Sequence, residues 1–177
     1  IIRGHFRASF GEVRCSSLPY YVPQHFGQYN QQTIAEALHV DSKIKALYNI
    51  LKGDTSISNF SILDDDWGIE EKCLSALSFW NLNHLELNQK ISSLSGGEKT
   101  KVFLAGMQIH SPSIILLDEP TNHLDSASRK KLYEYIQSSR ATMIIVSHDR
   151  TLLNLLPYTY ELGINGITFY GVNYDFY

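Results

Sequence analysis

The stretch from Ile114 to Asp125 constrains the fold of this 177-residue chain more than any other. It reads I-I-L-L-D-E-P-T-N-H-L-D, so an aliphatic run leads directly into the carboxylates of Asp118 and Glu119 and then into Pro120. Such a run predicts a strand buried in a parallel sheet, with its acidic groups at the rim of that sheet. Because unpaired buried carboxylates are costly, we expect a cation or a polar ligand there. The alternative is a strand that ends in solvent at a proline turn.

A second strand that we predict to be buried spans Thr142–Ser147, and His148 follows it directly. A helical pattern over Ser126–Ser139 separates the two strands. This order implies a right-handed crossover between parallel strands, whose ligands bind beyond the carboxyl ends. We therefore expect Asp118, Glu119 and His148 to converge on one rim. The alternative for His148 is a purely structural histidine.

The segment Ser92–Gly106 predicts a helix whose start is open to an anion. Within S-S-L-S-G-G-E, Ser95 and Glu98 have the spacing of a capping box. Gly96 and Gly97 leave the first backbone amides of the helix uncovered, and the positive end of the helix dipole adds to their attraction for phosphate. The alternative is an ordinary capped helix.

Short strands are expected near both ends of the chain. Leu18–Gln24 predicts a strand that ends at Pro23, so Gln24 either reaches a ligand or is an ordinary loop residue. Gly11–Val13 has the pattern of an entry to a strand. Tyr158–Phe169 predicts a hairpin that turns at Asn165-Gly166, because both residues tolerate positive φ.

The pattern from Thr33 to Trp80 predicts a subdomain of helices. Apolar residues recur there at helical spacing, namely Ile44, Leu47, Tyr48 and Leu51, and then Cys73, Leu74, Leu77 and Trp80. Between these stripes, Asp64–Asp66 has the chemistry of a solvated helix start, and we prefer that interpretation to a cation site.

Composition excludes several classes of protein. The hydrophobic fraction of 44% and the charged fraction of 19% are those of a globular protein with one sizeable core, and a net charge of −3 gives no general attraction for nucleic acid. No apolar stretch reaches the ~18 residues that span a bilayer, so we expect a cytoplasmic protein without membrane insertion. Cys15 and Cys73 are expected to be free thiols, because they are only two and lack metal-site spacing.

Five of these stretches resemble the motifs of the ABC ATPase superfamily, and they follow one another along the chain in the order of that family. Leu94–Glu98 is similar to the signature motif, Ile114–Glu119 to the Walker B strand and Leu124-Asp125 to the D-loop, while Gln24 matches the Q-loop and His148 the H-loop. The implied fold is α/β, a nucleotide-binding domain with a parallel-sheet core and an inserted α-helical subdomain. In this interpretation residues 1–32 and 111–177 form the core, and residues 33–110 form the helical subdomain with the signature motif.

The amino-acid sequences of three stretches resemble those of the ABC-F subfamily in particular. These are E-P-T-N-H-L-D at Glu119–Asp125, S-H-D-R at Ser147–Arg150, and G-x-N-Y-x-x-Y at Gly171–Tyr177. The resemblance implies a cytoplasmic protein that acts on the ribosome, as a translation factor or as an antibiotic-resistance factor by target protection. A basic set of side chains either meets rRNA or is a solvated surface, comprising Lys99, Lys101, Arg129, Lys130 and Lys131.

The chain departs from the family pattern in one respect, because it contains no G-x-x-x-x-G-K-[ST] phosphate loop. Ile1–Gly4 resembles the end of the helix that follows this loop in the family. We therefore expect the chain to be part of one ABC domain, with the first strands and the loop upstream, and to be inactive alone.

The resemblance also implies ligands and roles. ATP and Mg²⁺ are the expected ligands, with Asp118 holding Mg²⁺ through water near Gln24, Glu119 activating the attacking water, and His148 contacting the γ-phosphate. The signature residues Ser95, Gly96, Gly97 and Glu98 would bind ATP held by a second ABC domain, and Asp125 would lie at the contact between domains. That second domain belongs to the same chain or to a homodimer.

Two other functions stay open. The first is the ATPase subunit of an ABC membrane transporter, which needs a surface near Gln24 that meets a membrane partner. The second is an ABC-type ATPase of chromosome maintenance or repair. The absence of sustained heptads from the sequence counts against the second alternative.

Overall fold

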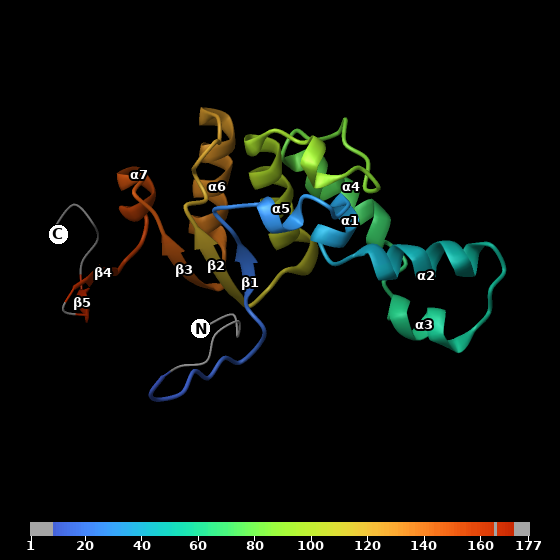
Figure 1. Ribbon diagram of the computed structural model, residues 1–177, viewed down its shortest axis with the longest axis horizontal. Helices are drawn as coiled ribbons and strands as arrows, with labels where there is room; N and C mark the ends of the chain where they lie inside the picture. The colour runs from blue at the N-terminus through green and yellow to red at the C-terminus, as the bar shows by residue number, and fades with distance from the viewer. Residues whose placement is uncertain (1–8, 165, 172–177) are drawn as a thin grey trace. The chain divides into compact units, whose positions relative to one another are not determined.

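The computed structural model describes residues 9–164 and 166–171 (Figure 1). These residues belong to two compact units. One unit contains the described parts of Ile1–Gln24 and Ser113–Tyr177, and the other is His25–Pro112. The expected helix end at Ile1–Gly4, the turn residue Asn165 and most of the G-x-N-Y-x-x-Y stretch lie outside the described residues.

The first unit is built on a three-stranded parallel sheet in the order β1-β2-β3. Its strands are β1 (Tyr20–Val22), β2 (Ile114–Asp118) and β3 (Thr142–Val146). The predicted acid-bearing strand is therefore the central one, and it pairs with β1 on one edge and with β3 on the other. Ile115 and Leu117 are buried on one face of β2, while the residues of its other face are half-buried.

The prediction that β3 is a buried strand is wrong. Ile144 and Val146 are 45% and 57% exposed, because β3 is the outer strand of this sheet and no described residues cover that face. The apolar run T-M-I-I-V predicts a strand correctly but does not distinguish a central strand from an outer one.

The predicted helix between the two strands is α6 (Ser126–Ser138), and it buries Leu132 and Ile136. Short α7 (Arg150–Leu153) follows β3. The predicted hairpin is formed by β4 (Thr159–Gly163) and β5 (Gly166–Tyr170), which pair antiparallel.

No strand begins at Gly11–Val13, contrary to expectation. Val13 is 47% exposed there, so the segment contributes little to a core that would hold it in a sheet.

The second unit is helical, as predicted for an insertion into the α/β fold (Figure 1). Its helices are η1 (Gly27–Tyr29), α1 (Ile34–Ala37), α2 (Asp41–Leu51), α3 (Ile57–Leu63), α4 (Ile69–Phe79), η2 (Ile91–Ser93) and α5 (Gly96–His110). The largest fully buried side chains of this unit include Trp80, Leu104 and Met107. Helices α4 and α5 contact each other, as do α2 and α3.

Both predicted apolar stripes of this unit are only partly buried. Ile44 and Leu47 are in the core of the unit, but Tyr48 is 41% and Leu51 is 69% exposed. On α4, Leu74 is 49% exposed although the other stripe residues are buried. A helix of 11 residues needs only a narrow stripe to pack, so apolar residues at the edge of the stripe reach the surface.

The aspartate run forms the turn between α3 and α4, and α4 begins at Ile69. Asp64 and Asp65 have left-handed backbone conformations with φ of 53° and 54°, which aspartate tolerates better than most residues. Asp66 pairs with Lys43 at 3.4 Å and with Lys72 at 2.9 Å. The run therefore ends one helix instead of starting the next.

Both cysteines are free, as expected, and burial raises the pKa of the Cys73 thiol to about 11. Among the helices that the structure describes, none is both long and apolar enough to cross a bilayer.

Candidate functional site

The rim of the sheet beyond β2 carries the predicted acidic groups. Asp118 is the last residue of β2 and is in register with Val146 on β3. Its Oδ2 atom accepts a hydrogen bond of 3.1 Å from the hydroxyl of Tyr21, which lies on β1. All three strands therefore contribute to the position of this carboxylate.

Glu119 follows β2 and occupies an unusual conformation. Its φ of 47° lies in the left-handed region, which is uncommon for glutamate and often occurs at functional sites. Its backbone N–H donates to the carbonyl oxygen of Val146 at 2.8 Å, which holds this turn against the end of β3. The residue is only 8% exposed, so its carboxylate is largely shielded from water.

His148 is the main polar neighbour of this buried carboxylate. Its Nε2 atom lies 3.5 Å from Oε1 of Glu119, and its backbone N–H donates to Oε2 at 3.4 Å. The imidazole itself is 98% exposed, so one side of the pair faces solvent. The structure thus brings Asp118, Glu119 and His148 to the same rim, as the strand order predicts.

The loop that carries His148 is held by Asp149. This aspartate caps α7 by accepting from Leu152 N at 3.2 Å, and its Oδ2 accepts from the Tyr133 hydroxyl of α6 at 2.6 Å. Burial raises the pKa of Asp149, but these hydrogen bonds outweigh burial and hold its pKa below the usual value. Burial and the same hydrogen bond raise the pKa of Tyr133 to about 12.

The loop after Glu119 is a chain of turns that ends in a helix cap. Thr121 is buried and His123 has a left-handed φ of 64°. Asp125 is the N-cap of α6, and its carboxylate accepts from Ser128 N at 2.8 Å and from Ser128 Oγ at 3.0 Å. These hydrogen bonds stabilise the start of α6.

The start of α5 has the predicted capping box. Ser95 Oγ donates to Glu98 Oε2 at 2.7 Å and accepts from Glu98 N at 3.3 Å, and Ser95 N donates to Oε2 at 2.8 Å. His84 Nε2 lies 2.9 Å from the other carboxylate oxygen. Hydrogen bonds from Ser95 and then from His84 lower the pKa of Glu98 to about 2. Ser95 and Gly96 are exposed, so the helix start is accessible.

The remaining predicted residues are distributed over both units. Gln24 is exposed two residues after β1, and within the described part of the chain no hydrogen bond joins it to Asp118. Ser95, Gly96, Gly97 and Glu98 belong to the helical unit. Lys99 of the predicted basic set donates to Asn30, and Lys130 lies 3.9 Å from Glu134.

Sequence reasoning missed Tyr21, Tyr133 and His84. The sequence places Tyr21 on a predicted strand. Its hydrogen bond to Asp118, however, depends on the register that aligns Tyr21 with Leu116. Tyr133 is 16 positions from Asp149 and His84 is 14 positions from Glu98, so no local spacing connects these pairs.

The donors at this rim suit an ion that is held mainly by water and phosphate oxygens. Within residues 9–164 and 166–171, no three histidine, cysteine or carboxylate side chains form a cluster that would cage a metal. A single carboxylate at a strand end is instead the kind of group that holds Mg²⁺ together with water and phosphate oxygens. Asp118 fits this role, because Tyr21 fixes one of its oxygens.

A parallel sheet with acidic groups beyond its central strand, together with a helical unit, is the arrangement of an α/β domain that binds ligands at the carboxyl ends of its strands. A sequence model of the family described as "ABC transporter" matches residues 15–122, which is more than half of the chain. The chain therefore belongs to the family of ABC transporter ATP-binding domains.

Three curated relatives illustrate the range of this family. The chain is 38% identical over 112 residues to the uncharacterized ABC transporter ATP-binding protein YkpA of Bacillus subtilis, covering 63% of this chain and 21% of that protein. It is 31% identical over 134 residues to the tylosin resistance ATP-binding protein TlrC of Streptomyces fradiae, covering 75% and 24%. It is 39% identical over 101 residues to elongation factor 3 of Candida glabrata, covering 57% and 10%. The chain thus spans a quarter or less of each relative.

Solved structures support the fold. An inward-facing metal-chelate type ABC transporter matches with a TM-score of 0.62 at 21% identity, over 96% of this chain and 65% of that chain. The dimeric ATP-binding cassette MJ0796 bound to ADP and phosphate matches with a TM-score of 0.56 at 24% identity, over 78% and 56%. At these identities the likeness concerns the fold alone.

Proposed function

We propose that the intact protein hydrolyses ATP as an ABC-F protein that acts on the ribosome. The observation that carries the ATPase proposal is the buried carboxylate of Glu119, held beside His148 at the end of the central strand. The ribosomal proposal is supported by the spelling E-P-T-N-H-L-D and by similarity to proteins named for translation elongation and tylosin resistance. The protein would then be a cytoplasmic translation factor or a resistance factor by target protection.

Asp118 would hold Mg²⁺ together with Gln24. The hydrogen bond from Tyr21 to Oδ2 restrains this carboxylate at the end of β2. When bound, Mg²⁺ would neutralise charge on the phosphates of ATP. Asp118 ends β2, and Gln24 follows the adjacent strand β1 by two residues, which suits two groups that approach one ion from the same edge.

Glu119 would orient the attacking water and take its proton. The oxygen of that water forms a bond to the γ-phosphorus, the bond to the ADP oxygen breaks, and the products are ADP and phosphate. His148 would donate a hydrogen bond to the γ-phosphate. Its exposed imidazole is free to meet a ligand while the Tyr133–Asp149 hydrogen bond holds its loop.

The start of α5 would bind the γ-phosphate of ATP on a second ABC domain through Ser95, Gly96 and Gly97. Glu98 stays ionised because of its low pKa, and its contacts with Ser95 and His84 keep the carboxylate at the cap. Asp125 would lie at the contact between the domains. A second domain, in the same chain or in a homodimer, is supported by the dimeric cassette that the fold matches.

Because the sequence has no G-x-x-x-x-G-K-[ST] loop, we propose that this polypeptide alone binds ATP weakly. The backbone amides and lysine of that loop are the main phosphate cradle in P-loop proteins. Asp118, Glu119 and His148 would complete an ATP site in which such a loop holds the phosphates.

The decisive experiment is sedimentation of the full-length Glu119→Gln protein with ribosomes in the presence of ATP. Loss of the base should trap an ATP-bound closed state, so the variant should co-sediment with ribosomes more than the parent does. Failure to co-sediment would favour the alternative, an ATPase subunit of a membrane transporter, which is supported by similarity to a relative named as an ABC transporter ATP-binding protein.

A further inference from the structure

The start of α5 carries a negative charge at a place where the proposed function brings a phosphate. Ser95 and the amides that follow it are proposed to bind the γ-phosphate of ATP on a second ABC domain, and Glu98 lies three residues after Ser95. A low pKa of about 2 keeps Glu98 ionised at neutral pH. Because like charges repel, a group that offsets the charge of Glu98 would assist phosphate binding.

The same carboxylate also engages the hydroxyl that is proposed to meet the phosphate. Ser95 Oγ donates a hydrogen bond of 2.7 Å to Oε2 of Glu98. A serine hydroxyl has only one proton to donate, so Ser95 must withdraw it from Glu98 before it can donate to a phosphate oxygen. The strength with which Glu98 holds this proton therefore affects the affinity for the γ-phosphate.

His84 contacts the other oxygen of this carboxylate. Its Nε2 atom lies 2.9 Å from Oε1 of Glu98, whereas both hydrogen bonds from Ser95 go to Oε2. Because ionised Glu98 can only accept, Nε2 of His84 carries the shared proton. Within residues 9–164 and 166–171, no lysine or arginine pairs with Glu98. His84 is therefore the basic side chain that stabilises the charge of this carboxylate.

The turn that carries His84 is anchored in the core of the helical unit. Leu82 is fully buried and Leu85 is 5% exposed, and Leu85 N donates to Leu82 O at 3.0 Å. His84 lies between these leucines, and its own side chain is 61% exposed. The leucines thus hold the imidazole at the start of α5, and the core of the unit does not depend on its burial.

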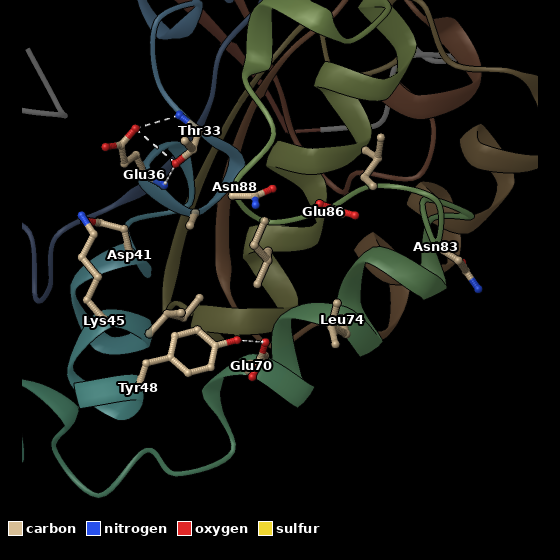
Figure 2. A pocket seen from close by; sticks show the side chains of 14 residues that line it. Thr33, Glu36, Asp41, Lys45, Tyr48, Glu70, Leu74, Asn83, Glu86 and Asn88 are labelled. Carbon is tan, nitrogen blue, oxygen red and sulfur yellow. Dashed lines mark hydrogen bonds and ion pairs between the residues drawn. The ribbon is translucent and has the colours of Figure 1, made fainter. Parts of the chain in front are cut away.

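A second capping box in the same unit forms without a histidine. Thr33 N and Thr33 Oγ1 both donate to Oε2 of Glu36 at the start of α1. Figure 2, which views a pocket of the helical unit, shows both contacts reaching one carboxylate oxygen. Among the described residues, no histidine, lysine or arginine engages Glu36. The contact of His84 is therefore additional to the helix cap, and it occurs at the box where a phosphate is expected.

We propose that His84 is a positioning residue that releases the hydroxyl of Ser95 to the γ-phosphate of ATP, an inference that rests on the proposed ATPase function. Its Nε2–H stabilises the charge of Glu98, so the carboxylate holds the Ser95 hydroxyl less strongly and repels the phosphate less. Ser95 N keeps its hydrogen bond of 2.8 Å to Oε2. The start of α5 thus stays capped when the hydroxyl turns to the phosphate.

The test measures equilibrium binding of radiolabelled ATP and ADP to the full-length protein that carries Glu119→Gln, in which bound ATP should persist. Adding His84→Ala should raise the dissociation constant for ATP about 3–5-fold, the size of effect that an exposed ion pair supports. The dissociation constant for ADP should not change, because ADP has no γ-phosphate. His84→Lys places a positive charge beside Glu98 again and should restore ATP binding.

A double-mutant cycle separates this role from a purely structural one. Glu98→Gln keeps the capping box, because glutamine also serves at this position, but it removes the charge that His84 offsets. In that background His84→Ala should no longer change ATP binding.

Two matched controls address the capping box and the turn. Glu36→Gln makes the same replacement in the capping box of α1, so His84→Ala should keep its full effect in that background. Asn83→Ala alters the exposed residue before His84 and should bind ATP like the parent. Circular dichroism checks that each variant is folded.

Each result supports the inference or overturns it. Equal ATP binding by the parent and His84→Ala would exclude it, as would an equal loss of ATP and ADP binding. An effect of His84→Ala that persists beside Glu98→Gln would show that His84 does not act through Glu98. A full-length parent that neither binds nor hydrolyses ATP would overturn the proposed function as well. A parent that hydrolyses ATP and is insensitive to His84→Ala would overturn this inference alone.

Discussion

Oε1 of Glu119 lies 3.5 Å from Nε2 of His148, although the two residues are 29 positions apart. One follows the central strand and the other follows the outer strand, so the pair depends on the register of β2 with β3. The left-handed conformation of Glu119 and the exposure of His148 leave a carboxylate shielded on one side and an imidazole open to a ligand on the other.

Replacement of Glu119 by glutamine should abolish most ATP hydrolysis by the full-length protein. A general base contributes about 10²–10⁴-fold to such a step, so the rate of phosphate release should fall by at least ~100-fold while ATP still binds. Glu134→Gln on α6 is a matched control, since that carboxylate is exposed and lies 3.9 Å from Lys130. Hydrolysis at the parent rate would exclude Glu119 as the base.

Tyr133→Phe should destabilise the unit that contains the sheet. The variant leaves the charged Asp149 without its hydroxyl donor, and hydrogen bonds to charged groups contribute about 1.5–3 kcal/mol when buried. Because Tyr133 is only half-buried, we expect a loss of about 1 kcal/mol in the free energy of unfolding, measured with urea. Tyr158→Phe, at a 59% exposed tyrosine, should leave that free energy unchanged.

The raised pKa of Tyr133 also predicts a dependence on alkaline pH. The folded-state pKa of about 12 lies above the ordinary value of 10.0, so the stabilising effect is complete below pH 10 and is lost as the pH rises toward 12. The difference in melting temperature between the parent and Tyr133→Phe should therefore shrink over that interval. A constant difference would mean that the hydroxyl does not act as a neutral donor to Asp149.

The low pKa of Glu98 predicts the opposite dependence at acidic pH. Its folded-state pKa of about 2 lies below the ordinary value of 4.5, so the capping box stabilises α5 above pH 4.5 and this effect is lost as the pH falls toward 2. Thermal melting from pH 5 to pH 3 should show a smaller loss of stability for Glu98→Gln than for the parent. Glu71→Gln should follow the parent curve, because Glu71 is exposed on α4.

Calorimetry with this polypeptide should show weak ATP binding. Without a phosphate loop the remaining groups offer few amide donors, so we expect a dissociation constant above ~100 µM. A low-micromolar constant would contradict the proposed dependence on that loop.

Local spacing alone determined the parts of this protein whose partners lie within a few residues. The capping box of Ser95 and Glu98, the helix over residues 126–138 and the acidic end of Ile114–Asp118 could all be predicted, because each depends on hydrogen bonds or periodicity along a short segment. The order of strand, helix and strand also predicted that Asp118, Glu119 and His148 would share a rim.

Only the tertiary structure decided which residues meet across long separations and which apolar positions stay exposed. Tyr133 reaches Asp149 and His84 reaches Glu98 because of the path of the chain, which no local pattern encodes. Tyr48 and Leu74 have the spacing of core residues, yet they line an open groove, and Ile144 and Val146 lie on an outer strand. Periodicity identifies the apolar face of an element, but burial depends on whether another element covers that face.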